Sequence, residues 1–172
     1  MFKKIINFGI INFHQKMRKR IYIDTSVVGG YFDDEFAKET KEFFDSIIEG
    51  TDILIISDLL EAELLRAPDF VKDLLSIITE KQIEKVSLTP ESIILADKYI
   101  EAKVIGKTSR ADCQHIALAT VNCADVLVSW NFKHIVNLDR IRGYNGINYQ
   151  WGYNMLEIRT PKEIIKYDND EK

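Results

Sequence analysis

The sequence predicts an α/β protein, a three-layer α/β/α domain around a central, mainly parallel sheet of about five strands. Two observations indicate this fold class. Short apolar runs typical of buried strands alternate along the chain with longer segments whose apolar residues recur at helical spacing. Such alternation is typical of βαβ units, whose right-handed crossovers place helices on the faces of a parallel sheet. The length of 172 residues suits one domain with its own core.

Each element follows from the local sequence. Strands are expected at residues 21–24, 53–57, 83–88, 126–130 and 156–159, and helices at 35–48, 58–79 with a break at Pro68, 91–105 and 111–122. Thr89 before Pro90 predicts a helix start, and the sequences at 109–112 and 160–163 predict capping boxes. The segment 143–152 is rich in Gly, Asn, Tyr and Gln, and it is expected to form an irregular loop.

The charges are distributed unevenly along the chain. The net charge is −4, but residues 1–20 hold six Lys or Arg and no carboxylate, so the other 152 residues carry a net −10. That count argues against binding nucleic acid through bulk electrostatics. Residues 1–19 are expected to be a basic extension outside the fold, and residues 168–172 a flexible acidic tail.

The cysteines and the apolar runs point to a cytoplasmic location. Cys113 and Cys123 make neither a disulfide framework nor a zinc-binding pattern, which fits reduced thiols in a cytosol. No apolar run approaches the ~20 residues of a membrane span, so no membrane partner is expected.

Polar residues follow two of the predicted strands at the end where ligands bind to open parallel sheets. Asp24 comes directly after the apolar first strand, where a buried acid needs a partner. The alternative is that Asp24 only caps the next turn. Ser129 and Asn131 follow the fourth strand at the same end, whereas Asp125 precedes that strand and is expected to be structural.

Two helices supply further acids. Glu61 and Glu63 project about 200° apart on one helix. Glu63, which has apolar neighbours, is expected to face the crevice, and Glu61 is expected to face solvent and pair with Arg66. Asp112 opens a nearly apolar helix, so it is either a capping carboxylate or a site acid. His115 shares its face, and it is either a packing residue or part of an Asp/His metal pair.

Four of these segments together resemble a PIN domain, and most closely the bacterial and archaeal VapC-like toxins of type II toxin–antitoxin pairs. The segments are Ile-Asp24-Thr25-Ser26, Ser57 with Glu63 six residues later, Asp112 in Asp-x-x-His-Ile-Ala, and Val-Ser129-Trp130-Asn131. The resemblance covers about residues 20–166 and implies a PIN domain at 20–167.

The resemblance implies a metal-dependent endoribonuclease. Carried over to this chain, the metal-binding and catalytic acids are Asp24, Glu63 and Asp112, which would hold Mg²⁺ or Mn²⁺. Asn131 stands where the family often has a fourth acid, so it keeps an oxygen donor but drops a charge. Ser26 and Ser129 would support the site. The resemblance also implies an RNA substrate, a cognate antitoxin and a homodimer.

The chemistry suits these residues, because hard cations prefer oxygen ligands and offset the repulsion between clustered carboxylates. Cations near the strand ends could meet the RNA backbone, and of these Arg110 and Lys133 are the expected contacts. The remaining candidates are Lys107, with Arg140 and Arg142 further out.

Other functions stay open. Asn131 would also suit a PIN-fold nucleic-acid or protein-binding module with weak or lost catalysis. A phosphatase of the haloacid dehalogenase type needs a second Asp where this chain has Ser26. Rossmann and P-loop nucleotide binders need glycine motifs that the sequence lacks.

Overall fold

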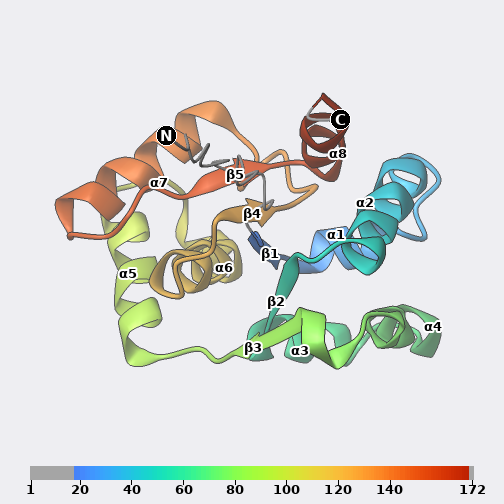
Figure 1. The fold of residues 1–172 in the computed structure, drawn as a ribbon. Helices are drawn as coiled ribbons and strands as arrows, with labels where there is room; N and C mark the ends of the chain where they lie inside the picture. The colour runs from blue at the N-terminus through green and yellow to red at the C-terminus, as the bar shows by residue number, and fades with distance from the viewer. Residues whose placement is uncertain (1–17, 171–172) are drawn as a thin grey trace, which may run out of the picture.

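The computed structural model describes residues 18–170, and it contains one five-stranded sheet in the order β3-β2-β1-β4-β5 (Figure 1). Every neighbouring pair of strands is parallel, which confirms the predicted fold class. The strands are β1 (Arg20–Ile23), β2 (Ile53–Ser57), β3 (Ile83–Val86), β4 (Val126–Val128) and β5 (Glu157–Arg159).

Helices cover both faces of this sheet (Figure 1). One face packs on α1 (Thr25–Gly30), α2 (Ala37–Glu49), α3 (Asp58–Leu64), α4 (Asp69–Lys72) and α8 (Pro161–Asp170), and the other on α5 (Pro90–Glu101), α6 (Arg110–Val121) and α7 (Leu138–Gln150). Side chains alternate between the two cores along β1, since Ile21 and Ile23 join the first and Tyr22 the second. The central strands are therefore buried on both sides, as parallel strands usually are.

The segment from α3 to β3 is less regular than the predicted helix 58–79. The helix breaks near Pro68, as predicted, and the short α4 passes into 3₁₀ turns at Asp73–Ile77 and Glu80–Gln82. A further 3₁₀ turn, Lys107–Ser109, leads into α6.

The predicted loop at 143–152 is wrong, because most of it belongs to α7. Tyr144 and Asn148 are fully buried, and the Tyr99 hydroxyl donates to Asn148 Oδ1 at 2.5 Å. Gly143 allows a close approach to the turn after α5, since a Cβ there would lie 2.7 Å from Cγ1 of Val104. Packing against α5 and α6 thus outweighs the weak helix propensity of this segment.

The predicted helix starts give mixed results. Thr89 caps α5, and the predicted capping box at 160–163 forms between Thr160 and Glu163. The capping box predicted at 109–112 is wrong: Ser109 makes no side-chain cap bond. An N-cap residue usually has an extended backbone. Ser109 does not, because the residues that lead into α6 already form a 3₁₀ turn.

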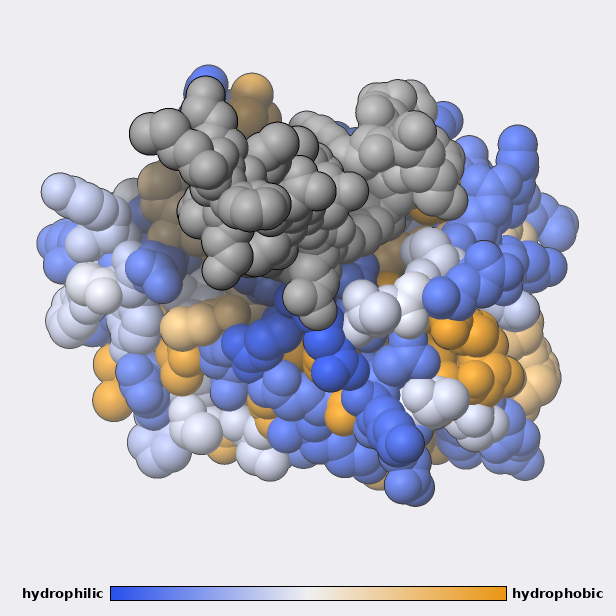
Figure 2. All heavy atoms as spheres, viewed as in Figure 1, coloured by the Kyte–Doolittle hydropathy of each residue, from blue (hydrophilic) through white to orange (hydrophobic). Residues whose placement is uncertain are grey.

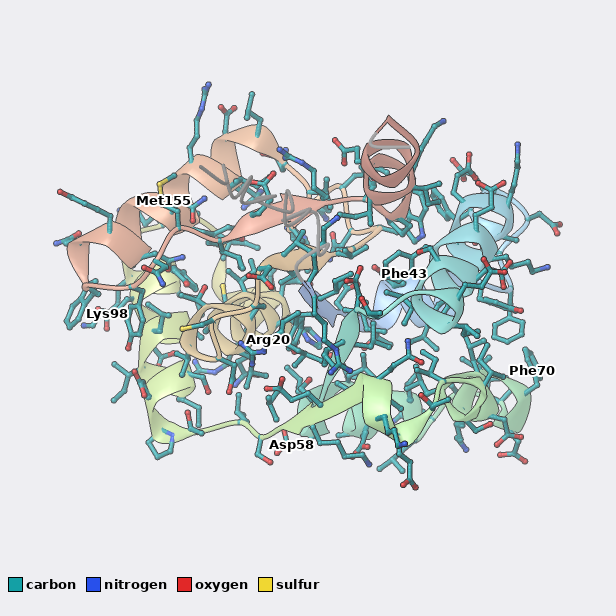
Figure 3. The ribbon with its side chains drawn as sticks, in the orientation of Figure 1. Arg20, Phe43, Asp58, Phe70, Lys98 and Met155 are labelled. Atoms are coloured by element: carbon teal, nitrogen blue, oxygen red, sulfur yellow. The ribbon has the colours of Figure 1, made fainter. Side chains whose placement is uncertain are left out.

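The molecular surface is mainly hydrophilic on the face drawn in Figure 2, with hydrophobic residues gathered on the side of α2 and α4. Phe70 of α4 lies at this outer edge (Figure 3), with 58% of its surface exposed. Among residues 18–170, no helix is long and apolar enough to cross a membrane. The predicted extension and tail lie largely outside the described residues, so the proposed domain limits stay predictions.

Candidate active site

Asp24 lies at the carboxyl end of β1 and is only 4% exposed. Its Oδ1 accepts a hydrogen bond from Ser26 Oγ at 2.6 Å, and its Oδ2 accepts one from Ser129 Oγ at 2.9 Å. Ser129 follows β4, which pairs with β1, so the sheet itself brings the two residues together. Asp24 is also the N-cap residue of α1, where its backbone carbonyl accepts from the N–H of Val27 and its side chain makes no cap bond. Burial raises the pKa of Asp24, although His115 and the two serine hydroxyls act in the opposite direction.

Glu63 reaches the same edge of the sheet from α3. Ser57 ends β2 and caps this helix, accepting a hydrogen bond from the backbone N–H of Leu60 at 3.1 Å. Glu63 Oε2 accepts from the Thr25 hydroxyl and lies 3.1 Å from His115 Nε2. Partial burial favours a higher pKa for Glu63, but the hydrogen bonds from His115 and Thr25 outweigh it and lower the pKa.

Asp112 approaches from the first turn of α6. Its Oδ1 accepts a hydrogen bond from Asn131 Nδ2 at 2.8 Å, while Asn131 Oδ1 accepts from the backbone N–H of His134 at 3.0 Å. Asn131 thus turns its nitrogen, and not its oxygen, towards the acid. Burial raises the pKa of Asp112, and the nearby charge of Glu63 raises it further, against the effects of His134 and His115.

His115 connects the three acids. It is 3% exposed, and its Nδ1 lies 2.8 Å from the Tyr22 hydroxyl, which lies 2.8 Å from Ser57 Oγ. Burial is the largest effect on the pKa of each of the three carboxyl groups and raises it, whereas His115 acts to lower it. Of the three acids, Glu63 contacts the imidazole directly, and His115 shares helix α6 with Asp112.

The side chains at this site have the donor atoms that a divalent cation prefers, but they are not arranged around one ion position. Mg²⁺ and Mn²⁺ prefer carboxylate oxygens, and a cation would offset the penalty that burial places on the ionised forms of Asp24 and Asp112. Within the described part of the chain, however, no three acidic, His or Cys side chains form a group able to hold a metal ion. Glu63 is engaged by Thr25 and His115, so a shared ion requires these side chains to adjust.

The predicted RNA contacts differ in their surroundings. Lys133 is exposed, directly after Asn131 and the half-exposed Phe132. Arg110 is also exposed, but its guanidinium forms an ion pair with Asp97 at 2.6 Å.

Two other acids lie away from this group. Asp125 accepts a hydrogen bond from the backbone N–H of Arg20 at the opposite end of the sheet, which confirms a structural role. Glu61 is exposed, as predicted, but it pairs with Lys85 at 2.7 Å, so the predicted partner Arg66 is wrong. Lys85 lies on β3, next to the strand that leads into α3.

Sequence reasoning named Thr25 and Ser57 in the motifs but gave them no contact in the site, and it missed two further residues, Tyr22 and His134. Tyr22 lies inside an apolar strand, where nothing in the sequence distinguishes it from a core residue. His134 has a buried Nδ1 that finds no hydrogen-bond partner among the described residues, and it lies between Asn131 and α7.

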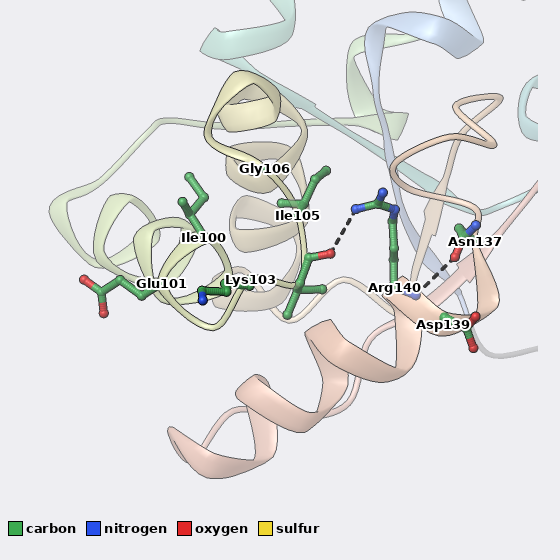
Figure 4. Close-up of a pocket in the computed structure, with 9 residues that line it drawn as sticks. Ile100, Glu101, Lys103, Ile105, Gly106, Asn137, Asp139 and Arg140 are labelled. Carbon is green, nitrogen blue, oxygen red and sulfur yellow. Dashed lines mark hydrogen bonds between the residues drawn. The ribbon is translucent and has the colours of Figure 1, made fainter.

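A hollow of about 870 Å³ lies between the end of α5, the turn that leads to α6 and the start of α7 (Figure 4). Arg140 projects from α7 across this hollow and donates to the carbonyl oxygen of Val104 at 2.9 Å.

Comparison with known proteins agrees with the fold. A chain in the crystal structure of VapBC2 from Rickettsia felis bound to a DNA fragment from their promoter matches with a TM-score of 0.50 and 14% identity. The match covers 82% of this chain and 98% of that chain, and at this identity it shows the fold alone. No curated protein matches the chain. The family model described as PIN domain matches residues 21–133. The chain therefore belongs to the PIN domain family.

Proposed function

We propose that the chain is a metal-dependent endoribonuclease that hydrolyses phosphodiester bonds in RNA. The observation that carries this proposal is that Glu63 bonds to Thr25, which directly follows Asp24, and to His115, which lies on the same helix as Asp112. Acids held close together without a cation are costly, and they are retained where they have a chemical task. Membership of the PIN domain family supports the same conclusion.

The residues take separate roles in this proposal. The carboxylates of Asp24, Glu63 and Asp112 would hold Mg²⁺ or Mn²⁺. When bound, such an ion lowers the pKa of a water molecule and offsets the charge that develops on the phosphate. The serine hydroxyls at 26 and 129 fix both oxygens of Asp24, so that this acid meets the ion without reorganising. Asn131 orients Asp112.

Lys133 would bind the RNA backbone. Arg110 would also bind it, after its ion pair with Asp97 is broken. We further propose that the chain is a cytoplasmic toxin of a type II toxin–antitoxin pair and works as a homodimer. The fold shared with the chain from the VapBC2 structure supports this assignment. Exposed apolar side chains on the side of α2 to α4 offer area for protein contacts; they are Phe32, Leu65, Phe70 and Ile77.

The decisive experiment is cleavage of RNA by the purified chain with Mg²⁺ or Mn²⁺. We expect EDTA to abolish cleavage, and the double variant Asp24→Asn, Asp112→Asn to lose it as well. Asp69→Asn is a suitable control, because the Asp69 side chain is 94% exposed and remote from the acids. Cleavage that survives EDTA, or survives the double variant, would contradict the proposal.

A binding module with lost catalysis is the second candidate, and the orientation of Asn131 favours it. The Asn131 oxygen is engaged by His134, so in this conformation it is not offered to a cation. Calorimetric titration with Mn²⁺ separates the two candidates. RNA binding without any millimolar metal binding would favour the module.

A further inference from the structure

We propose that the hollow between α5, α6 and α7 binds a phosphodiester group of the RNA strand, with Arg140 and Lys103 as its cationic contacts. This inference rests on the proposed function and extends the site beyond the acids. The hollow measures about 870 Å³ and is partly walled by apolar side chains, including Ile100 and Ile105. It has room for a sugar-phosphate unit as well as for the two cationic side chains.

Arg140 is placed to receive an anion. Its guanidinium lies in the hollow, where one nitrogen donates to the Val104 carbonyl oxygen (Figure 4). This bond fixes the plane of the group and leaves the other N–H groups of the guanidinium available, which matches the planar recognition of phosphate by arginine. Across residues 18–170, no carboxylate lies within ion-pair distance of Arg140.

The charges around the hollow leave a positive excess. The two acids on its rim have cations of their own, since Glu101 pairs with Lys98 at 2.7 Å and Asp139 lies 4.0 Å from Arg142. Lys103 is exposed and, in the described part of the chain, forms no ion pair. Two cations are thus unpaired in a chain whose residues 21–172 carry a net negative charge. A polyanion would find its favourable contacts here.

The helix that carries Arg140 is hydrogen-bonded to the loop that contacts Asp112. Tyr144 lies one helical turn after Arg140 on α7, and its hydroxyl donates to the carbonyl oxygen of His134 at 2.9 Å. The backbone N–H of His134 donates to Asn131, and Asn131 donates to Asp112. One RNA strand would place one phosphate at the acids and a further phosphate at Arg140.

Binding of a labelled single-stranded RNA, measured by fluorescence anisotropy in EDTA at 50–200 mM salt, tests this inference. We expect Arg140→Gln to weaken binding by roughly tenfold and to lower the salt slope by about one unit. Lys103→Asn should act in the same direction. In cleavage assays both variants should raise KM and leave kcat nearly unchanged.

The choice of variants separates the loss of charge from other effects. Lys103 has φ of 58°, a left-handed conformation that Asn tolerates well, so Lys103→Asn removes the charge without disturbing the backbone. Lys38→Asn is the matched control, because Lys38 is an exposed cation on α2, which packs on the other face of the sheet. If the wild type cleaves RNA but neither variant changes affinity or salt slope, the hollow is not a phosphate site. If the wild type neither binds nor cleaves RNA, the proposed function fails as well.

Discussion

Charged side chains at the two ends of the sheet have different kinds of partner. At the amino end, Arg20 donates to Glu84 through Nε at 3.0 Å and to the carbonyl oxygens of Asn122 and Cys123 at 2.7 and 2.8 Å (Figure 3). Asp125 accepts from the Arg20 backbone there. At the carboxyl end, the acids accept hydrogen bonds only from hydroxyl, amide and imidazole groups.

This difference separates structural charge from functional charge. Within residues 18–170, no Lys or Arg pairs with Asp24, Glu63 or Asp112, whereas Arg20 is satisfied on all sides. At the amino end, the ion pair with Glu84 anchors β1 to β3, and hydrogen bonds anchor it to the loop before β4. The uncompensated acids at the carboxyl end add repulsion that lowers stability in the absence of a cation.

The largest expected effect is on activity at the carboxyl end. Glu63→Gln should lower kcat by about 10²- to 10³-fold if Glu63 meets the metal ion or the reacting phosphate. Glu61→Gln is a matched control, because the same change on the same helix falls on an exposed residue paired with Lys85. Single-turnover cleavage rates measure both. Equal losses in the two variants, or no loss in either, would remove Glu63 from the site.

The fold was predictable from the sequence because its signals are local or periodic. Continuous apolar runs define the strands, and apolar residues at helical spacing define most helices. The error at 143–152 has a tertiary cause, since Tyr144 and Asn148 stabilise α7 by packing that weak local propensity does not reveal.

The candidate site was predictable only in part. Acids directly after strands are visible in the sequence, because parallel strands bring their carboxyl ends to one edge. The sequence does not show which groups contact these acids. The bond from Asn131 to Asp112 joins residues 19 apart, and the contact of Tyr22 with His115 joins residues 93 apart. Such contacts depend on side-chain packing across elements.

A smaller effect is expected on stability at the amino end. Arg20→Met should lower the free energy of unfolding by about 2 kcal/mol, because it leaves two carbonyl oxygens and Glu84 without a donor. Cleavage by the folded variant should be unchanged. Urea denaturation gives the free energy, and Arg142→Met, at an exposed site, should change it little. Lost activity in a stable Arg20→Met variant would contradict the separation of the two ends.

The smallest expected effect is on stability, from a substitution that adds one negative charge at the carboxyl end of the sheet. Asn131→Asp keeps an oxygen for the His134 N–H but replaces the donor to Asp112 with a second carboxylate, so the metal-free protein should lose about 1 kcal/mol of stability. Millimolar Mn²⁺ should then raise its melting temperature more than that of the wild type, because binding to the folded state adds stability. Asn131→Ala loses the same donor without gaining charge, and its response to Mn²⁺ should not exceed that of the wild type. Identical Mn²⁺ responses in the Asp variant and the wild type would mean that position 131 does not face the ion.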